Sequence, residues 1–129
     1  MMNLLVVDDS ELIRSRLLEW LTGIPGLNRI DTAASLAQTL QQVSREQPGM
    51  VILDLQLPDG NAIQIIPELK RIAPGMQIAV LTNNASEFNR NRCLEAGADW
   101  FFDKSTEFEK VQVLVQIQAD RPGIDGVPT

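Results

Sequence analysis

The sequence has no histidine and only one cysteine, Cys93, among its 129 residues. The lack of histidine excludes most metal triads and the hydrolase schemes in which histidine activates a serine or a cysteine. A single cysteine cannot form a disulfide within the chain, which is typical of a protein in a reducing cytoplasm. We therefore expect a cytoplasmic protein and assign Cys93 to packing.

Basic residues and long apolar runs are also scarce. The chain has 11 Lys and Arg against 17 Asp and Glu, so it lacks the basic surface that direct nucleic-acid binding needs. No run approaches the roughly 18 apolar residues of a membrane span, and the first residues show no secretory signal. We expect a soluble protein that binds neither nucleic acid nor a membrane.

Short apolar runs alternate with longer segments of helical periodicity, which is the pattern of an α/β fold with a parallel sheet covered on both faces. The expected strands are residues 4–7, 29–33, 50–53, 77–81 and 100–102, and the expected helices are residues 10–22, 35–46, 61–73, 86–96 and 106–119. Pro67 should kink the third helix or delay its start. Trp20 and Phe88 are expected to face the core. We place one domain at residues 1–119 and a short flexible tail at 120–129.

The last expected helix has an ambiguous pattern. Its β-branched residues alternate with polar ones, as in a half-buried strand. We favour a helix because five strands and four helices already alternate, and the last strand needs a cover. A helix cannot bury all of these β-branched side chains, so some should form an exposed partner surface. The residues concerned are Val111, Val113, Val115 and Ile117.

Polar residues follow the expected strands at their carboxyl ends. Asp8 and Asp9 follow the first strand, Asp54 the third and Thr82 the fourth, and Lys104 comes soon after the fifth. In an open parallel sheet these ends form the crevice in which ligands bind. Three carboxylates in one crevice repel one another unless a cation neutralises them, and oxygen ligands suit a hard ion such as Mg²⁺.

Such a site suits phosphoryl transfer. With the ion on Asp9 and Asp54, one Asp54 oxygen stays free to attack phosphorus, while Lys104 and the Thr82 hydroxyl contact the phosphoryl oxygens. Each residue alone also has an ordinary structural interpretation, as a helix cap, a turn carboxylate, a strand-end hydroxyl or a surface charge. Their joint placement after four strands favours one common site.

These residues lie in motifs that resemble the receiver domain of bacterial two-component response regulators. The motifs occur in the family's order: VDDS at 7–10, VILDLQLPDG at 51–60, LT at 81–82, GAD at 97–99 and DKS at 103–105. The similarity covers residues 3–119. It implies a flavodoxin-like, CheY-like, doubly wound parallel sheet of five strands in the order 2-1-3-4-5 with five helices. It also implies a protein that is not an enzyme, beyond catalysing its own phosphorylation and dephosphorylation.

The resemblance also implies a phosphoacceptor and a metal site. Asp54 would accept a phosphoryl group from a phosphohistidine on a sensor histidine kinase or a histidine phosphotransfer protein. Mg²⁺ would be bound by Asp9, Asp54 and the backbone carbonyl of Gln56, with Asp8 acting largely through water.

Further residues would hold the phosphoryl group and transmit its presence. The resemblance implies that Thr82 and Lys104 contact the phosphoryl group, and that Gln56 and Asn84 tune its lifetime. Phe101 occupies the position of the switch aromatic, which turns inward as Thr82 moves toward phosphate. This movement would remodel the face made by the fourth helix, the fifth strand and the fifth helix. A downstream protein would bind that face, and a homodimer is open as well.

The chain departs from the family pattern in three respects, namely Phe101, Asn83, and the pair Gln56 and Asn84 at the tuning positions, and two other functions stay open. Phe101 has no polar tip to report the inward state, and Asn83 is larger than usual for its position, which narrows access to the phosphoryl site. One alternative is a receiver-fold interaction module that takes no phosphate, although the intact acid, hydroxyl and ammonium groups argue against it. The other is a phosphatase with an aspartate nucleophile, which usually has an acid where this chain has Gln56. A stand-alone receiver and a fragment of a longer protein are both open.

Overall fold

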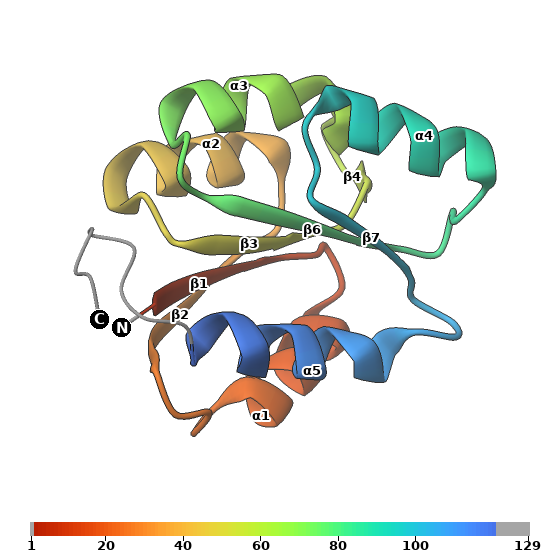
Figure 1. The fold of residues 1–129 in the computed structure, drawn as a ribbon. Helices are drawn as coiled ribbons and strands as arrows, with labels where there is room; N and C mark the ends of the chain where they lie inside the picture. The colour runs from red at the N-terminus through yellow and green to blue at the C-terminus, as the bar shows by residue number, and fades with distance from the viewer. Residues whose placement is uncertain (1, 121–129) are drawn as a thin grey trace.

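The computed structural model describes residues 2–120 and contains a five-stranded parallel sheet in the order β2-β1-β3-β6-β7 (Figure 1). Its strands are β1 (Met2–Val7), β2 (Leu27–Ala33), β3 (Met50–Leu53), β6 (Gln77–Thr82) and β7 (Trp100–Asp103). The predicted fold class and strand order are confirmed. Of the predicted tail at 120–129, all but Asp120 lies outside the described residues, so the domain division stays a prediction.

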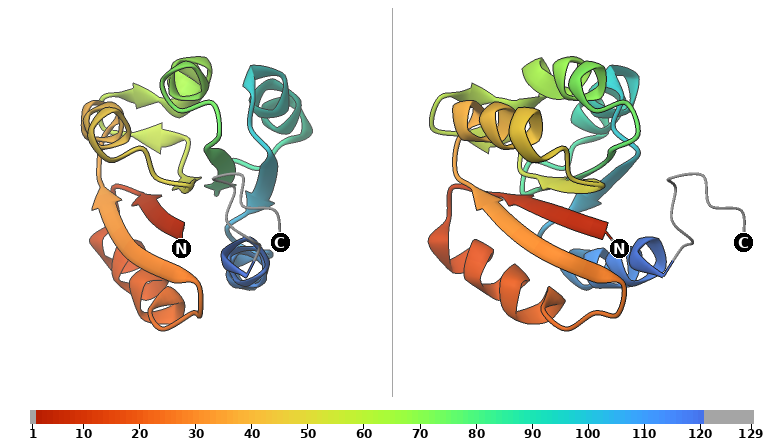
Figure 2. Two further views of the ribbon diagram at one scale, coloured as in Figure 1. Left: turned by 60° about the vertical axis from the view of Figure 1, so that its left-hand side comes forward. Right: turned by 90° about the vertical axis from the view of Figure 1, so that its left-hand side faces the viewer.

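Helices cover both faces of the sheet (Figures 1 and 2). The helices are α1 (Glu11–Leu21), α2 (Leu36–Glu46), α3 (Ile66–Ile72), α4 (Glu87–Ala96) and α5 (Phe108–Ala119). α2, α3 and α4 lie on one face, and α1 and α5 lie on the other. Within residues 2–120, no helix combines the length and apolar character that crossing a bilayer requires.

The central strands are apolar along their length because both faces are buried. In β1, Leu5 and Val7 join the core under α2, α3 and α4, whereas Leu4 and Val6 join the core under α1 and α5. All four are at most 1% exposed. The continuous apolar run therefore follows from alternate side chains that enter two separate cores.

The segment between β3 and α3 differs from the prediction of one helix over 61–73. Gln56–Leu57 (β4) pairs antiparallel with Gly60–Asn61 (β5), and a 3₁₀ turn at Ala62–Ile65 leads into α3. Pro67 lies in the first turn of α3, where its missing N–H leaves no intrahelical bond unmade. Of the two predicted outcomes, a kink or a delayed start, the structure shows the delayed start, because α3 begins at Ile66.

The start of α2 is capped by residues from two parts of the chain. Ser35 Oγ accepts a hydrogen bond from Gln38 N–H at 3.1 Å. The Asp59 carboxylate, which comes from the turn between β4 and β5, accepts from the N–H groups of Leu36 at 2.8 Å and Ala37 at 3.0 Å. These donors lower the pKa of Asp59 below its ordinary value. A residue assigned from sequence to a turn therefore also ties that turn to a helix.

The helix predicted for residues 106–119 is confirmed as α5. Val111 and Val115 are fully buried, whereas Val113 and Ile117 are 53% and 56% exposed. Each pair is spaced by four residues, so the helix places the two pairs on different sides. The predicted exposed apolar surface is present.

Two aromatic residues were wrongly expected in the core. Trp20 is 36% exposed and packs edge-on against Phe108 of α5, with ring centroids 5.0 Å apart. Phe88 is 68% exposed and lies beneath the Arg92 guanidinium. The buried residue of α4 is instead Cys93, which confirms its assignment to packing.

Candidate functional site

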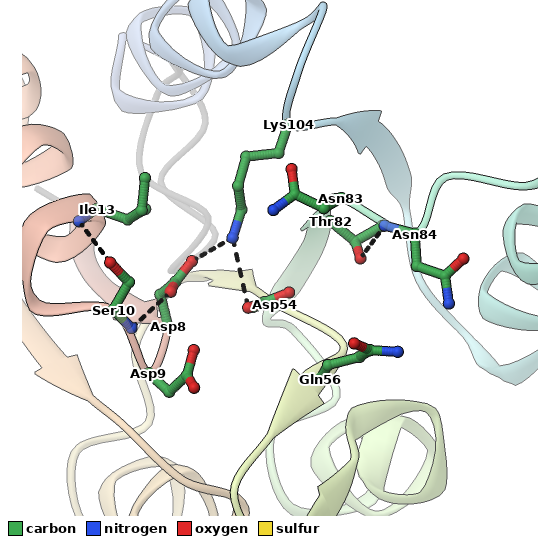
Figure 3. Close-up of a pocket in the computed structure, with 10 residues that line it drawn as sticks. All are labelled: Asp8, Asp9, Ser10, Ile13, Asp54, Gln56, Thr82, Asn83, Asn84 and Lys104. Carbon is green, nitrogen blue, oxygen red and sulfur yellow. Dashed lines mark hydrogen bonds and ion pairs between the residues drawn. The ribbon is translucent and has the colours of Figure 1, made fainter.

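A polar crevice lies at the carboxyl ends of β1, β3, β6 and β7 (Figure 3). Ten residues line it: Asp8, Asp9, Ser10, Ile13, Asp54, Gln56, Thr82, Asn83, Asn84 and Lys104. The fold thus brings together all the predicted site residues except Phe101. Phe101 is buried in the core under α2, α3 and α4.

Three carboxylates form the acidic part of the crevice. Asp8 and Asp54 are buried, at 2% and 7% exposed, and Asp9 is exposed. The sheet fixes the buried pair, because Asp8 N–H donates to Ala33 O at 3.1 Å and Asp54 N–H donates to Val7 O at 3.0 Å. The two acids therefore extend the hydrogen-bond ladder of the strands by one residue.

The acidic group fits a hard divalent cation. One oxygen from each of Asp8, Asp9 and Asp54 lies within 4.8 Å of the others. Carboxylate oxygens on an open crevice, with space for water, are the ligands that Mg²⁺ prefers. These residues can therefore hold a metal ion. Which metal they hold, and whether the Gln56 carbonyl contributes, stay predictions.

Asp8 is held by the first turn of α1 (Figure 3). Ser10 N–H donates to Asp8 Oδ1 at 2.9 Å, and Ser10 Oγ accepts from Ile13 N–H at 3.2 Å as the N-cap of α1. Arg14 donates to the Asp8 backbone carbonyl at 2.7 Å. Asp8 therefore belongs to the crevice and is also bonded to the start of α1. The Arg14 contact was not predicted, since no local pattern relates a helical arginine to a carbonyl of the preceding loop.

Lys104 bridges the two buried carboxylates. Its Nζ lies 2.6 Å from Asp8 Oδ2 and 3.4 Å from Asp54 Oδ2, and its side chain is 8% exposed. Burial is the largest influence on Asp54 and raises the pKa of its carboxyl; Lys104 opposes this rise and Asp8 adds to it. At neutral pH the ammonium compensates for part of the charge gathered in the crevice.

Strand β6 contributes a buried hydroxyl at its carboxyl end. Thr82 is 1% exposed, and its Oγ1 accepts a hydrogen bond from Asn84 N–H at 3.0 Å. The Asn84 carbonyl in turn accepts from the Asn89 side chain of α4 at 3.0 Å. Asn83, Asn84 and Gln56 are exposed at the rim of the crevice. The hydroxyl is therefore linked to α4 through a single residue.

Phe101, in β7, lies in the core and contacts Arg90 of α4. It is 7% exposed, and the Arg90 guanidinium lies 6.0 Å from its ring centroid. Arg90 also donates to the Phe101 carbonyl at 3.4 Å. The ring is thus in an inward position. Its role as a switch is not tested by this position and stays a prediction.

The response regulator receiver domain model matches residues 4–116, and the chain belongs to this family. DevR/DosR, a DNA-binding transcriptional activator of Mycobacterium tuberculosis, is 29% identical over 126 residues, covering 97% of this chain and 58% of that protein. KdpE, the KDP operon transcriptional regulatory protein of Escherichia coli, is 30% identical over 128 residues, covering 99% and 56%. The chain thus spans little more than half the length of these curated relatives.

A solved structure shows the same likeness. A response regulator from Burkholderia pseudomallei, crystallised with a phosphorylated aspartic acid, a calcium ion and citrate, superposes with a TM-score of 0.81 at 26% identity. The match covers 92% of this chain and 69% of that chain. The predicted family is confirmed: this is the receiver domain of a two-component response regulator.

Proposed function

We propose that the chain is a phosphorylation-dependent switch that takes a phosphoryl group onto Asp54. One observation carries the proposal: three carboxylates, an ammonium group and a buried hydroxyl meet in one crevice of a receiver fold. The phosphorylated aspartic acid in the related Burkholderia structure supports the same chemistry here. The cytoplasm, where kinase phosphohistidines are formed, is the expected location.

In the proposed reaction an Asp54 oxygen forms a bond to phosphorus as the nitrogen–phosphorus bond of a phosphohistidine breaks. The departing imidazole keeps the electron pair of that bond and takes a proton. Mg²⁺ held by Asp9, Asp54 and the Gln56 carbonyl, with Asp8 acting through water, would supply positive charge to the oxygens of the transferred group. The Lys104 ammonium balances the remaining charge, and the Thr82 hydroxyl donates to a phosphoryl oxygen after leaving the Asn84 amide.

The donor would be a sensor histidine kinase or a histidine phosphotransfer protein, as the resemblance to the family implies. The mouth of the crevice is open to such a partner, since Asp9 and the rim residues Asn83 and Asn84 are exposed. Leu12, which lies in the first turn of α1 between the crevice residues Ser10 and Ile13, is 68% exposed and offers an apolar contact for docking.

The output would be a protein contact on the face made by α4, β7 and α5. Phe88, Val113 and Ile117 are 68%, 53% and 56% exposed on its two helices. Exposed apolar side chains of this kind are typical of interaction sites. α4 has one buried side chain, so little packing resists its displacement when Thr82 leaves Asn84. The partner on this face would be a downstream protein or a second copy of the chain.

Two observations favour the switch over the alternatives. A module that takes no phosphate would not need a buried ammonium between two acids, because an unneeded buried ion pair brings little stability. A phosphatase would need an acid near Asp54 to protonate a leaving group, and Gln56 at the crevice rim is an amide. Gln56 and Asn84 stand at the rim and are proposed to set how fast water reaches the phosphoryl group.

Incubation with acetyl phosphate or phosphoramidate and Mg²⁺ tests the proposal. Intact mass spectrometry should show one added phosphoryl group on the wild type and none on Asp54→Asn. A matched control is Asp31→Asn, which removes an acid of β2 that pairs with Arg29; it should be phosphorylated like the wild type. Wild-type protein that gains no mass would contradict the proposal, and rapid release of phosphate from phosphomonoesters would favour the phosphatase.

A further inference from the structure

Lys104 lies at the start of the short loop between β7 and α5. Its backbone N–H donates to Thr82 O at 2.9 Å, which fixes this end of the loop to the sheet. The lysine side chain is a flexible four-carbon stem with a compact charge at its end. The position of the ammonium therefore depends on how firmly the backbone at Lys104 is held.

Two carboxylates fold this loop back on itself. Asp103 Oδ1 accepts hydrogen bonds from the backbone N–H of Ser105 at 2.9 Å and from its hydroxyl at 2.7 Å. Glu107 Oε1 accepts from Asp103 N–H at 2.9 Å, and Glu107 N–H donates to Asp103 O at 2.7 Å. Asp103, which precedes Lys104, is thus bonded to Ser105, which follows it. Asp103 is also bonded twice to Glu107.

Glu107 does not act as an ordinary helix cap. It occupies the N-cap position of α5, yet its side chain makes no cap hydrogen bond to that helix. Its carboxylate points back to the N–H of Asp103 instead. It also pairs with Lys110 at 3.0 Å, but Lys110 is 65% exposed, and such surface pairs contribute little stability. The contact of Glu107 that matters for the loop is therefore the hydrogen bond it accepts from Asp103 N–H.

We propose that Asp103 and Glu107 are positioning residues for Lys104, which keep its ammonium between Asp8 and Asp54. Neither residue lines the crevice, so both act through the backbone that carries the lysine. The consequence for phosphorylation rests on the proposed function. The position of the Lys104 ammonium does not rest on the proposed function and can be measured separately.

The test compares truncated and conservative variants. Asp103→Ala and Glu107→Ala remove the acceptor oxygens, whereas Asp103→Asn and Glu107→Gln keep an oxygen that can accept the same N–H groups. Glu109→Ala is the matched control, because it removes an exposed acid from the first turn of α5. A melting curve of each variant shows whether it folds.

The first measurement is a lysine-selective carbon-13 spectrum, which is simple because the chain has three lysines. The Lys104 signal should move toward that of the exposed Lys110 in both alanine variants. It should keep its wild-type position in the asparagine, glutamine and Glu109→Ala variants. An unmoved Lys104 signal in folded alanine variants would overturn the proposal, whether or not the protein takes phosphate.

The second measurement is the rate of phosphorylation by phosphoramidate at saturating Mg²⁺, together with the Mg²⁺ affinity. The alanine variants should react roughly tenfold more slowly, since misplacing a reacting group by an ångström costs up to about 10²-fold. Their Mg²⁺ affinity should not fall, because the crevice carboxylates of Asp8, Asp9 and Asp54 are unchanged. Equal loss of rate, Mg²⁺ affinity and melting temperature would indicate general unfolding and contradict the proposal. A wild type that takes no phosphate would instead contradict the proposed function.

Discussion

The ammonium of Lys104 lies closer to Asp8 than to Asp54, at 2.6 Å against 3.4 Å. Both acids also belong to the group proposed to surround a divalent cation. A carboxylate oxygen bound to the ammonium is less available to a metal, and the two positive charges repel each other. We therefore expect Lys104 to oppose cation binding at the same site where it is proposed to assist phosphoryl transfer.

Replacing Lys104 with methionine should separate these two effects. We expect Lys104→Met to bind Mg²⁺ more tightly, by roughly threefold to tenfold, because a charge a few ångströms away is worth about 1 kcal/mol or more. Its phosphorylation should be strongly slowed. Isothermal titration and the mass assay measure the two quantities. Lys110→Met, which removes an exposed lysine of α5, should change neither; weaker Mg²⁺ binding by Lys104→Met would contradict the competition.

Asp54→Asn should stabilise the protein in a buffer without divalent cations. The pKa of Asp54 is raised, so the folded state binds the carboxyl proton of Asp54 more tightly than the unfolded state does. The stability that this proton contributes is lost as pH rises through the folded-state pKa. Removing the charge should raise the free energy of unfolding at neutral pH by about 1 kcal/mol, which is within the common range for stabilising substitutions. Urea unfolding checks this, and the gain should shrink in acid, where the wild type is protonated.

The cap formed by Asp59 should make stability depend on pH in the opposite sense. Its pKa is lowered because the carboxylate accepts from the N–H groups of Leu36 and Ala37. The contribution of the Asp59 carboxylate to stability is fully present above its ordinary pKa of 3.8. It is lost as pH falls through the lower pKa of the folded state. Urea midpoints measured from neutral to acidic pH should converge for the wild type and Asp59→Ala. Parallel curves would contradict a charged cap.

Two valines of α5 should differ sharply in their effect on stability. Val111→Ala removes two buried methyl groups and should cost about 2 kcal/mol of unfolding free energy. Val113→Ala should change stability by less than about 0.5 kcal/mol, because Val113 is largely exposed and alanine favours a helix. Chemical denaturation measures both. Equal losses would be expected only if the two residues faced the same core, as in a strand.

The sheet could be predicted from sequence because each buried strand is a short apolar run that ends in a polar residue. Asp54 and Thr82 stand directly at such ends, so the parallel order of strands places them in one crevice. The pattern was weaker for α5, where β-branched residues two apart also suit a strand. There the need to cover β7 decided correctly in favour of a helix.

Other features depend on contacts between distant segments and left no local signal. Asp59 lies in a turn sequence, and its bonds to the start of α2 follow from how β4 and β5 fold back. Trp20 fits an inward helical position, yet it is 36% exposed and packs edge-on against Phe108 of α5. The preference of Lys104 for Asp8 likewise depends on side-chain geometry that motif spacing does not contain.

Cys93 is the one buried side chain of α4, and burial raises the pKa of its thiol to about 11. At neutral pH the folded protein should therefore resist alkylation, because the thiol is both protonated and covered. Maleimide labelling then requires α4 to separate from the sheet. Since the chain has no other cysteine, the labelling rate of the unmodified protein reports this opening directly, without an introduced probe.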